Sequence, residues 1–82
     1  MYYSILNSKV EGQKQQYTVI IGKKTSNNFI CHTFFISKSP IAKEWAVFPV
    51  KNKQIDYSNA DLTHLDYNLK LKDIIKITHS CL

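Results

Sequence analysis

The residues best suited to chemistry are two short groups of soft metal ligands, Cys31-His32 and His79-Ser80-Cys81. Four Cys and His side chains are a common ligand set for zinc. Neighbouring residues on a strand point to opposite faces, so Cys31 and His32 cannot easily bind one ion together. A three-ligand site would need the C-terminal segment to pair beside the strand that carries Cys31. We therefore predict no metal site and expect Cys31 to act as a small apolar side chain.

Neither cysteine lies in a sequence context that is typical of a nucleophile. The chain contains no nucleophile elbow and no glycine-lined oxyanion loop, and its six acidic residues are scattered. The segment Gly22-Lys-Lys-Thr-Ser26 differs from a phosphate-binding loop, which needs glycine where this chain has Tyr17 and Ser or Thr where it has Lys24. We therefore predict that the protein is not an enzyme and carries no cofactor.

Lysine supplies all 11 basic residues, and the formal net charge is +5. Positive charge favours acidic partners such as an acidic protein surface or nucleic acid. Arginine, which performs most of the bidentate reading of guanine, is absent, so any nucleic-acid binding would be nonspecific and sensitive to salt. A lysine surface that only maintains solubility is the simpler explanation of the same charge.

The elements that would position these residues are mainly strands of one domain, residues 1–82. Aromatic and β-branched residues cluster in four segments that we predict to be strands, residues 2–6, 17–21, 29–37 and 45–50. The second and third form an antiparallel hairpin around the basic loop 22–28. Ser58 and Asp61 have the spacing of a capping box, and Leu62, Leu65 and Leu69 follow at helical spacing. These positions predict a short helix over residues 59–66.

The last segment, residues 67–78, fits two structures. Apolar and polar residues alternate over residues 67–72, which favours a strand; Asp73 interrupts the pattern, and residues 74–78 resume it. A helix over residues 71–77 is the alternative. The fold we predict is α+β: a small four- to five-stranded, mostly antiparallel sheet with one short helix. An all-β open barrel is the alternative architecture.

The predicted strand at residues 29–37 is apolar on both faces. Phe34 lies on one face with Ile30 and Ile36, and Phe35 lies on the other. An antiparallel sheet in a small protein normally buries one face and leaves the other in water. The second face must therefore be covered by the chain's own loops or by association. On this basis we expect self-association, with a two-fold homodimer as the commonest form.

In size and composition the chain is similar to small accessory proteins of phages and mobile elements, inhibitors of host defence among them. Its Lys, Asn, Ile, Tyr and Phe residues have A/T-rich codons, and it carries no catalytic motif. The resemblance implies a non-enzymatic protein that acts by docking on a host protein or protein complex, with an acidic surface. The alternative is a weakly sequence-specific nucleic-acid-binding domain that uses a lysine-rich face.

Candidate partner-binding residues combine the basic positions with the two-faced strand. They are Lys23, Lys24, Phe34, Phe35, Lys51, Lys53, Lys70 and Lys72. The N-terminal residues do not have the pattern of a signal peptide, and no apolar run reaches the roughly 18 residues that cross a bilayer. We therefore expect a cytoplasmic protein without a membrane partner.

Overall fold

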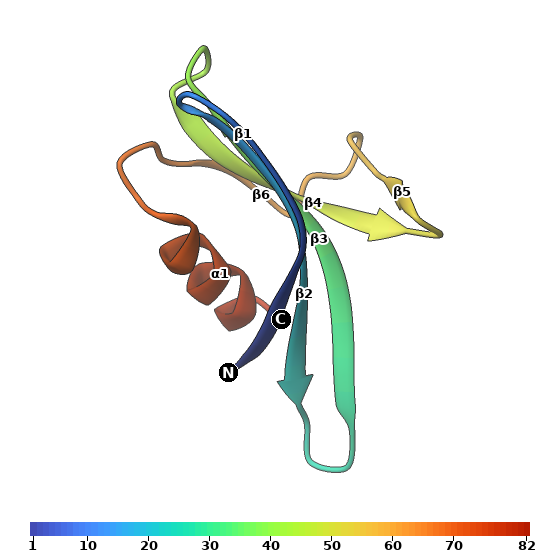
Figure 1. Cartoon of the computed structure of the whole chain (residues 1–82). Helices are drawn as coiled ribbons and strands as arrows, with labels where there is room; N and C mark the ends of the chain where they lie inside the picture. Colours follow the sequence, from blue (N-terminus) through green and yellow to red (C-terminus); the bar gives the residue numbers. More distant parts are fainter.

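Six strands form one open sheet with antiparallel pairing, and a single helix lies against one of its faces (Figure 1). The computed structural model describes all residues, 1–82. The elements are β1 (Tyr2–Glu11), β2 (Lys14–Lys24), β3 (Phe29–Ser39), β4 (Glu44–Lys51), β5 (Gln54–Ile55), β6 (Leu62–Asp66) and α1 (Leu71–Ser80). Strands β1 to β4 lie in chain order, and the far edge of β4 pairs with both β5 and β6.

The α+β class and the antiparallel sheet are confirmed, whereas the predicted strand count is too low. The sheet has six strands rather than four or five, and it is open. The additional strands are short, because β5 has two residues and β6 has five. The strand β1 extends through a polar segment to Glu11, where Gly12 takes a φ of 61° and reverses the chain into β2.

The hydrophobic core lies between the central strands and the helix. Eight apolar side chains are buried there: Val19, Ile21, Phe34, Ile36, Trp45, Val47, Ile74 and Ile75. Alternate residues of β2, β3 and β4 supply six of them, since side chains two residues apart on a strand share a face. Burial of one such large side chain contributes about 1.5 to 3 kcal/mol. The hydrophobic core therefore lies on the face of the sheet that α1 covers.

Helix α1 occupies the segment for which the sequence favoured a strand. The helical alternative over residues 71–77 is correct, and the helix continues to Ser80. Its buried residues Ile74, Ile75 and Thr78 share one side of the helix, and Leu71 packs beside them. At its start, the main-chain N–H of Lys70 donates to the Asp73 carboxylate over 2.9 Å. The helical period of the apolar side chains outweighs the strand preference of isoleucine and threonine.

The predicted helix over residues 59–66 is wrong, because most of that segment is β6. Leu62 and Leu65, three residues apart, would point to opposite faces of a regular strand. His64 takes a φ of 57°, and the pairing with β4 shifts at this point, so that Leu62 lies opposite Val47 and Leu65 lies opposite Trp45. Both leucines therefore pack against the core from a strand.

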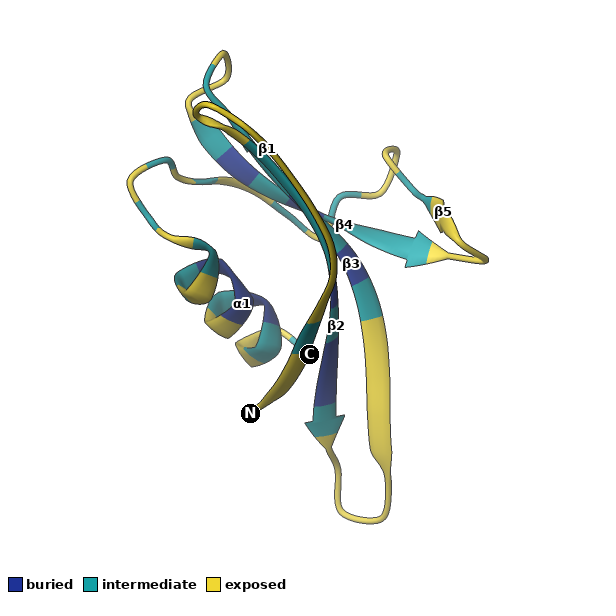
Figure 2. Ribbon diagram, viewed as in Figure 1, coloured by how far each residue is buried: buried dark blue, intermediate teal, exposed yellow.

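Strand β3 lies in the middle of the sheet but is covered unevenly. Phe34 and Ile36 are buried under α1, whereas the first residues of β3 extend beyond the helix and are exposed (Figure 2). Phe29 is 55% exposed and Ile30 is 45% exposed. The β2–β3 hairpin therefore projects as an arm from a molecule that measures 42 × 25 × 21 Å.

Candidate functional site

Three aromatic rings pack together on the sheet face that α1 does not cover. Phe35 of β3 lies directly opposite Phe48 of β4, with ring centroids 6.4 Å apart. Tyr57 meets both rings edge-on, with centroids 6.1 Å from Phe35 and 5.3 Å from Phe48. Tyr57 is 64% exposed, so no other part of the chain lies over it. The cluster is held in a fixed geometry and remains open to a partner.

The loop that carries Tyr57 is fixed by its neighbour Asp56. The main-chain N–H of Asp56 donates to the Pro49 carbonyl over 2.9 Å. Its carboxylate accepts hydrogen bonds from the Ser58 N–H, over 3.2 Å, and from the Asn59 amide, over 2.9 Å. In Figure 1 the β4–β5 hairpin bends away from the side that holds α1. The hairpin and these hydrogen bonds place Tyr57 over the uncovered face.

A second aromatic pair extends the same face along the arm. Phe29 lies over Gly22, and a Cβ added at Gly22 would come within 2.3 Å of the ring. Tyr2 of β1 meets Phe29 edge-on at 5.6 Å and is 52% exposed. Strand register puts this pair on the same face as the three-ring cluster. We call the five residues the aromatic face: Tyr2, Phe29, Phe35, Phe48 and Tyr57.

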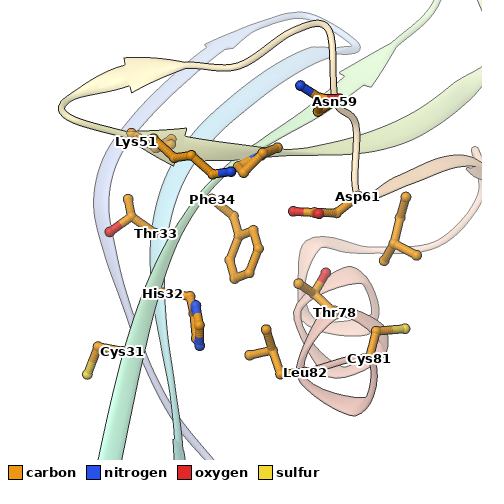
Figure 3. Close-up of a pocket in the computed structure, with 13 residues that line it drawn as sticks. Cys31, His32, Thr33, Phe34, Lys51, Asn59, Asp61, Thr78, Cys81 and Leu82 are labelled. Atoms are coloured by element: carbon orange, nitrogen blue, oxygen red, sulfur yellow. The ribbon is translucent and has the colours of Figure 1, made fainter.

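A hollow of about 530 Å³ opens on the opposite side of the sheet, beside the last turn of α1 (Figure 3). Figure 3 shows the Phe34 ring at its centre, with His32 below and the Asp61 carboxylate directed toward it. The hydroxyl of Thr78 also lines it but donates to the Ile74 carbonyl over 2.8 Å. The hollow mixes apolar and polar side chains.

Residues of both cysteine-histidine groups, Cys31, His32 and Cys81, line the hollow, but they are not arranged to bind one metal ion. Both cysteines are free and exposed, and in Figure 3 the sulfur of Cys31 points away from the hollow that His32 lines. No group of three His, Cys, Asp or Glu side chains lies close enough to hold a metal ion. Exposed Cys31 also differs from the buried apolar side chain that the sequence predicted. The only contact of a histidine with an acid is that of His64 with Glu44, over 3.1 Å at the surface.

The predicted partner-binding residues are distributed over several parts of the molecule. Phe34 is only 4% exposed and belongs to the core, so it is not part of an exposed docking surface. Phe35 is half-buried within the aromatic face. The ammonium group of Lys23 donates to the main-chain oxygen of Leu82 beside the helix. Lys24 is exposed at the end of β2.

The remaining predicted lysines do not form one face with Lys24. Lys51 ends β4 at the rim of the hollow, and Lys53 lies in the β4–β5 turn with a φ of 64°. Lys70 and Lys72 lie at the start of α1, not on a strand. All four are exposed, so each is accessible, but they lie at a strand end, in a turn and at a helix start rather than on one face.

Two lysines outside the predicted partner-binding set lie against an aromatic ring. The ammonium groups of Lys38 and Lys43 are 4.5 and 5.3 Å from the centre of the Tyr67 ring. At these distances a cation is attracted to the ring face. The three residues come from β3, the β3–β4 turn and the β6–α1 loop, so no local pattern could have revealed the contact.

The fold defines a small α+β protein with a half-covered antiparallel sheet. Comparison of the chain with protein-family models, curated proteins and solved structures finds no match. None of its helical structure is both long and apolar enough to cross a membrane.

Proposed function

We propose that this protein is a non-enzymatic binding module that docks on another protein through its aromatic face. The observation that carries the proposal is the packed cluster of Phe35, Phe48 and Tyr57 on the sheet face that α1 does not cover. The exposed face of a small antiparallel sheet is normally polar. Clustered aromatic side chains in that position are typical of the central residues of a protein interface.

The rings also satisfy the requirement for a preorganised surface. Asp56 fixes the Tyr57 loop, and Phe35 and Phe48 lie on paired central strands. A partner that binds rings already held in place avoids much of the side-chain entropy cost of association, about 0.5 to 1.5 kcal/mol for each immobilised side chain.

The partner surface is expected to be acidic. The chain has a net charge of +5, and strand register puts Lys24 on the same face as Phe29. Positive charge around an apolar contact raises the association rate with an acidic surface and makes that rate sensitive to salt. As a finer proposal, the protein is an inhibitor from a phage or mobile element that occupies a surface of a host complex. The small size of the chain and its many residues with A/T-rich codons support this finer proposal.

A second candidate function is nonspecific nucleic-acid binding. It is favoured by Lys38 and Lys43, whose ammonium groups both lie within 5.3 Å of the centre of the Tyr67 ring. The aromatic face is the stronger candidate, because both of these lysines already interact with the protein's own tyrosine.

The test uses exposed positions whose replacement leaves the core intact. Immobilised wild-type protein captures binding proteins, which are identified and then purified for direct affinity measurement. We expect Tyr57→Ala to weaken binding of the purified partner at least about tenfold, which corresponds to about 1.4 kcal/mol.

The matched control is Ile41→Ala, because Ile41 is 95% exposed in the β3–β4 turn, outside the aromatic face. It should bind the partner as the wild type does. Equal affinity of wild type and Tyr57→Ala would refute docking through this face. Capture of nucleic acid alone, reduced by Lys38→Gln and Lys43→Gln, would favour the second candidate function.

A further inference from the structure

Strand β1 forms a long unprotected edge of the sheet. Its ten residues pair with β2 on one side only, and nine of them are exposed. The opposite edge is formed by β5 and β6, which have two and five residues. Short edge strands limit pairing with another chain, whereas a long edge offers a row of free main-chain N–H and C=O groups.

The exposed apolar side chains concentrate on this edge. Ten large apolar side chains of the protein are exposed, and six of them fall within the first ten residues. These six are Met1, Tyr2, Tyr3, Ile5, Leu6 and Val10. Apolar side chains gathered beside free main-chain groups are typical of a surface that pairs with another strand.

The charge of β1 selects the kind of partner. Its only charged side chains are Lys9 and Glu11, whose ammonium and carboxylate lie 3.4 Å apart. The strand is therefore neutral, although the whole chain carries +5. An acidic partner gains nothing from a neutral strand, whereas an identical neutral strand can pair with it without charge repulsion.

We infer that β1 is a homodimer interface, at which β1 of a second copy pairs antiparallel to give one continuous sheet. Side chains opposite each other in a sheet must lie on the same face. Full overlap of the ten residues puts Tyr3 opposite Val10 of the second copy, and Ile5 opposite Ser8. In a regular strand these partners would lie on opposite faces, because their numbers differ by odd amounts.

The irregularity in β1 removes that mismatch. The pairing with β2 shifts by one residue between Ile5 and Asn7, which inserts Leu6 as an extra residue. Tyr3 pairs with Ile21 of β2, and Val10 pairs with Gln15. Ile21 and Gln15 are an even number of residues apart and share a face of β2, so Tyr3 and Val10 also lie on the same face. The register with full overlap is therefore also the register that matches the faces. It sets Lys9 opposite Ser4 of the second copy, so no like charges meet.

The same symmetry brings the two helices onto one side of the double sheet. A two-fold axis between antiparallel strands is perpendicular to the sheet and preserves its faces. Helix α1 lies closest to β2, and the two copies of β2 would be three strand spacings apart, about 14 Å. Since a helix is about 10 to 12 Å wide, a narrow channel remains between the helices. Tyr3, Ile5 and Val10 of both copies line its floor, which gives these exposed side chains apolar neighbours.

The test measures the oligomeric state by sedimentation at micromolar concentration. We expect the wild type to sediment at twice its 9.5 kDa mass. Ile5→Lys places a charge in the channel and should raise the dissociation constant about tenfold or more. Ile5 is 47% exposed in the single chain, so the substitution does not disturb the monomer core. The matched control is Ile41→Lys, the same change at a turn residue, which should leave the dimer unchanged.

Amide hydrogen exchange provides a measurement that needs no variant. The main-chain N–H groups of β1 should gain protection as protein concentration rises, while those of β6 should not. A wild type that remains monomeric at these concentrations overturns the inference. A dimer that persists in Ile5→Lys, or that leaves β1 exchange independent of concentration, also overturns it, because the dimer then uses another surface. Since Tyr57→Ala does not alter this edge, failure here leaves the docking proposal standing.

Discussion

Phe34 and Phe35 are adjacent residues with different environments. Phe34 is 4% exposed beneath α1, whereas Phe35 is half-buried with Phe48 and Tyr57 on the uncovered face. The sequence placed both among the partner-binding candidates because both faces of the strand are apolar. The structure shows that one face is core, so only Phe35 retains that role as a candidate.

We expect Phe34→Ala to remove a large part of the free energy of unfolding. Truncation of a buried phenylalanine costs about 3 to 5 kcal/mol, through lost transfer free energy and the cavity that remains. At about 0.05 to 0.15 kcal/mol per residue, a chain of this length has roughly 4 to 12 kcal/mol in total. Urea unfolding followed by circular dichroism measures the loss.

The paired variant Phe35→Ala serves as the comparison. It removes a half-buried ring and should cost less free energy of unfolding than Phe34→Ala, while it weakens the Phe48 and Tyr57 contacts. If Phe34→Ala unfolded at the same urea concentration as the wild type, the assignment of this face to the core would be wrong.

At the scale of elements, α1 decides which face of the sheet becomes core. Two contacts hold its N-terminal end in position. The indole N–H of Trp45 donates to the Leu69 carbonyl over 3.0 Å, and the Asp73 carboxylate accepts the Lys70 N–H over 2.9 Å. The first attaches the loop before the helix to β4, and the second satisfies a main-chain donor at the helix start.

We expect Asp73→Ala to lower the free energy of unfolding by about 0.5 to 2 kcal/mol. It removes the acceptor for the Lys70 N–H and a negative charge from the first turn of the helix. The fluorescence of Trp45, the only tryptophan, reports the loss during chemical unfolding. Lys76→Ala, at an exposed position of the same helix, should change stability by less than about 0.5 kcal/mol. Equal effects of the two substitutions would show that Asp73 does not stabilise the helix start.

At the scale of the whole molecule, positive charge is spread rather than gathered. Lysines lie on the arm, at the hollow, in the β4–β5 turn and along α1, and Lys38 and Lys43 both contact the Tyr67 ring. A ligand that spans one face would contact only a few of them. The net charge therefore favours long-range attraction to acidic surfaces more than a dense phosphate-binding site.

Binding to duplex DNA is accordingly expected to be weak and independent of sequence. Its dissociation constant should be no tighter than about 1 µM at physiological salt, and its logarithm should vary linearly with the logarithm of salt concentration. Fluorescence anisotropy with duplexes of unrelated sequence measures both properties. A nanomolar affinity for one sequence at physiological salt would contradict this expectation and favour the nucleic-acid function.

Local pattern was sufficient for much of the sheet. The segments around residues 17–21, 29–37 and 45–50 are strands as predicted, because alternating aromatic and β-branched residues report the period of a strand directly. The β2–β3 hairpin also follows from two such segments around a polar loop. Length alone indicated a domain with a small core, and eight buried apolar residues form it.

The local sequence pattern gave the wrong structure where the apolar residues fit both the period of a helix and that of a strand. Leu62 and Leu65 have helical spacing, yet a positive φ at His64 lets both reach the core from a strand. Ile74 and Ile75 have high strand preference, yet their spacing with Thr78 suits a helix that covers the sheet. In both segments the outcome depends on which distant residues offer an apolar surface, and a local pattern does not contain that information.

The candidate site depended even more on tertiary structure. The sequence by itself determined which segments are apolar strands, that lysine alone supplies the basic charge, and that neighbouring strands pair antiparallel. Only the tertiary structure decided that α1 covers Phe34 and leaves Phe35 open, that Tyr57 crosses to meet Phe48, and that β1 remains an edge. The physical reason is that a strand fixes which side chains share a face, whereas burial of that face depends on where the rest of the chain docks.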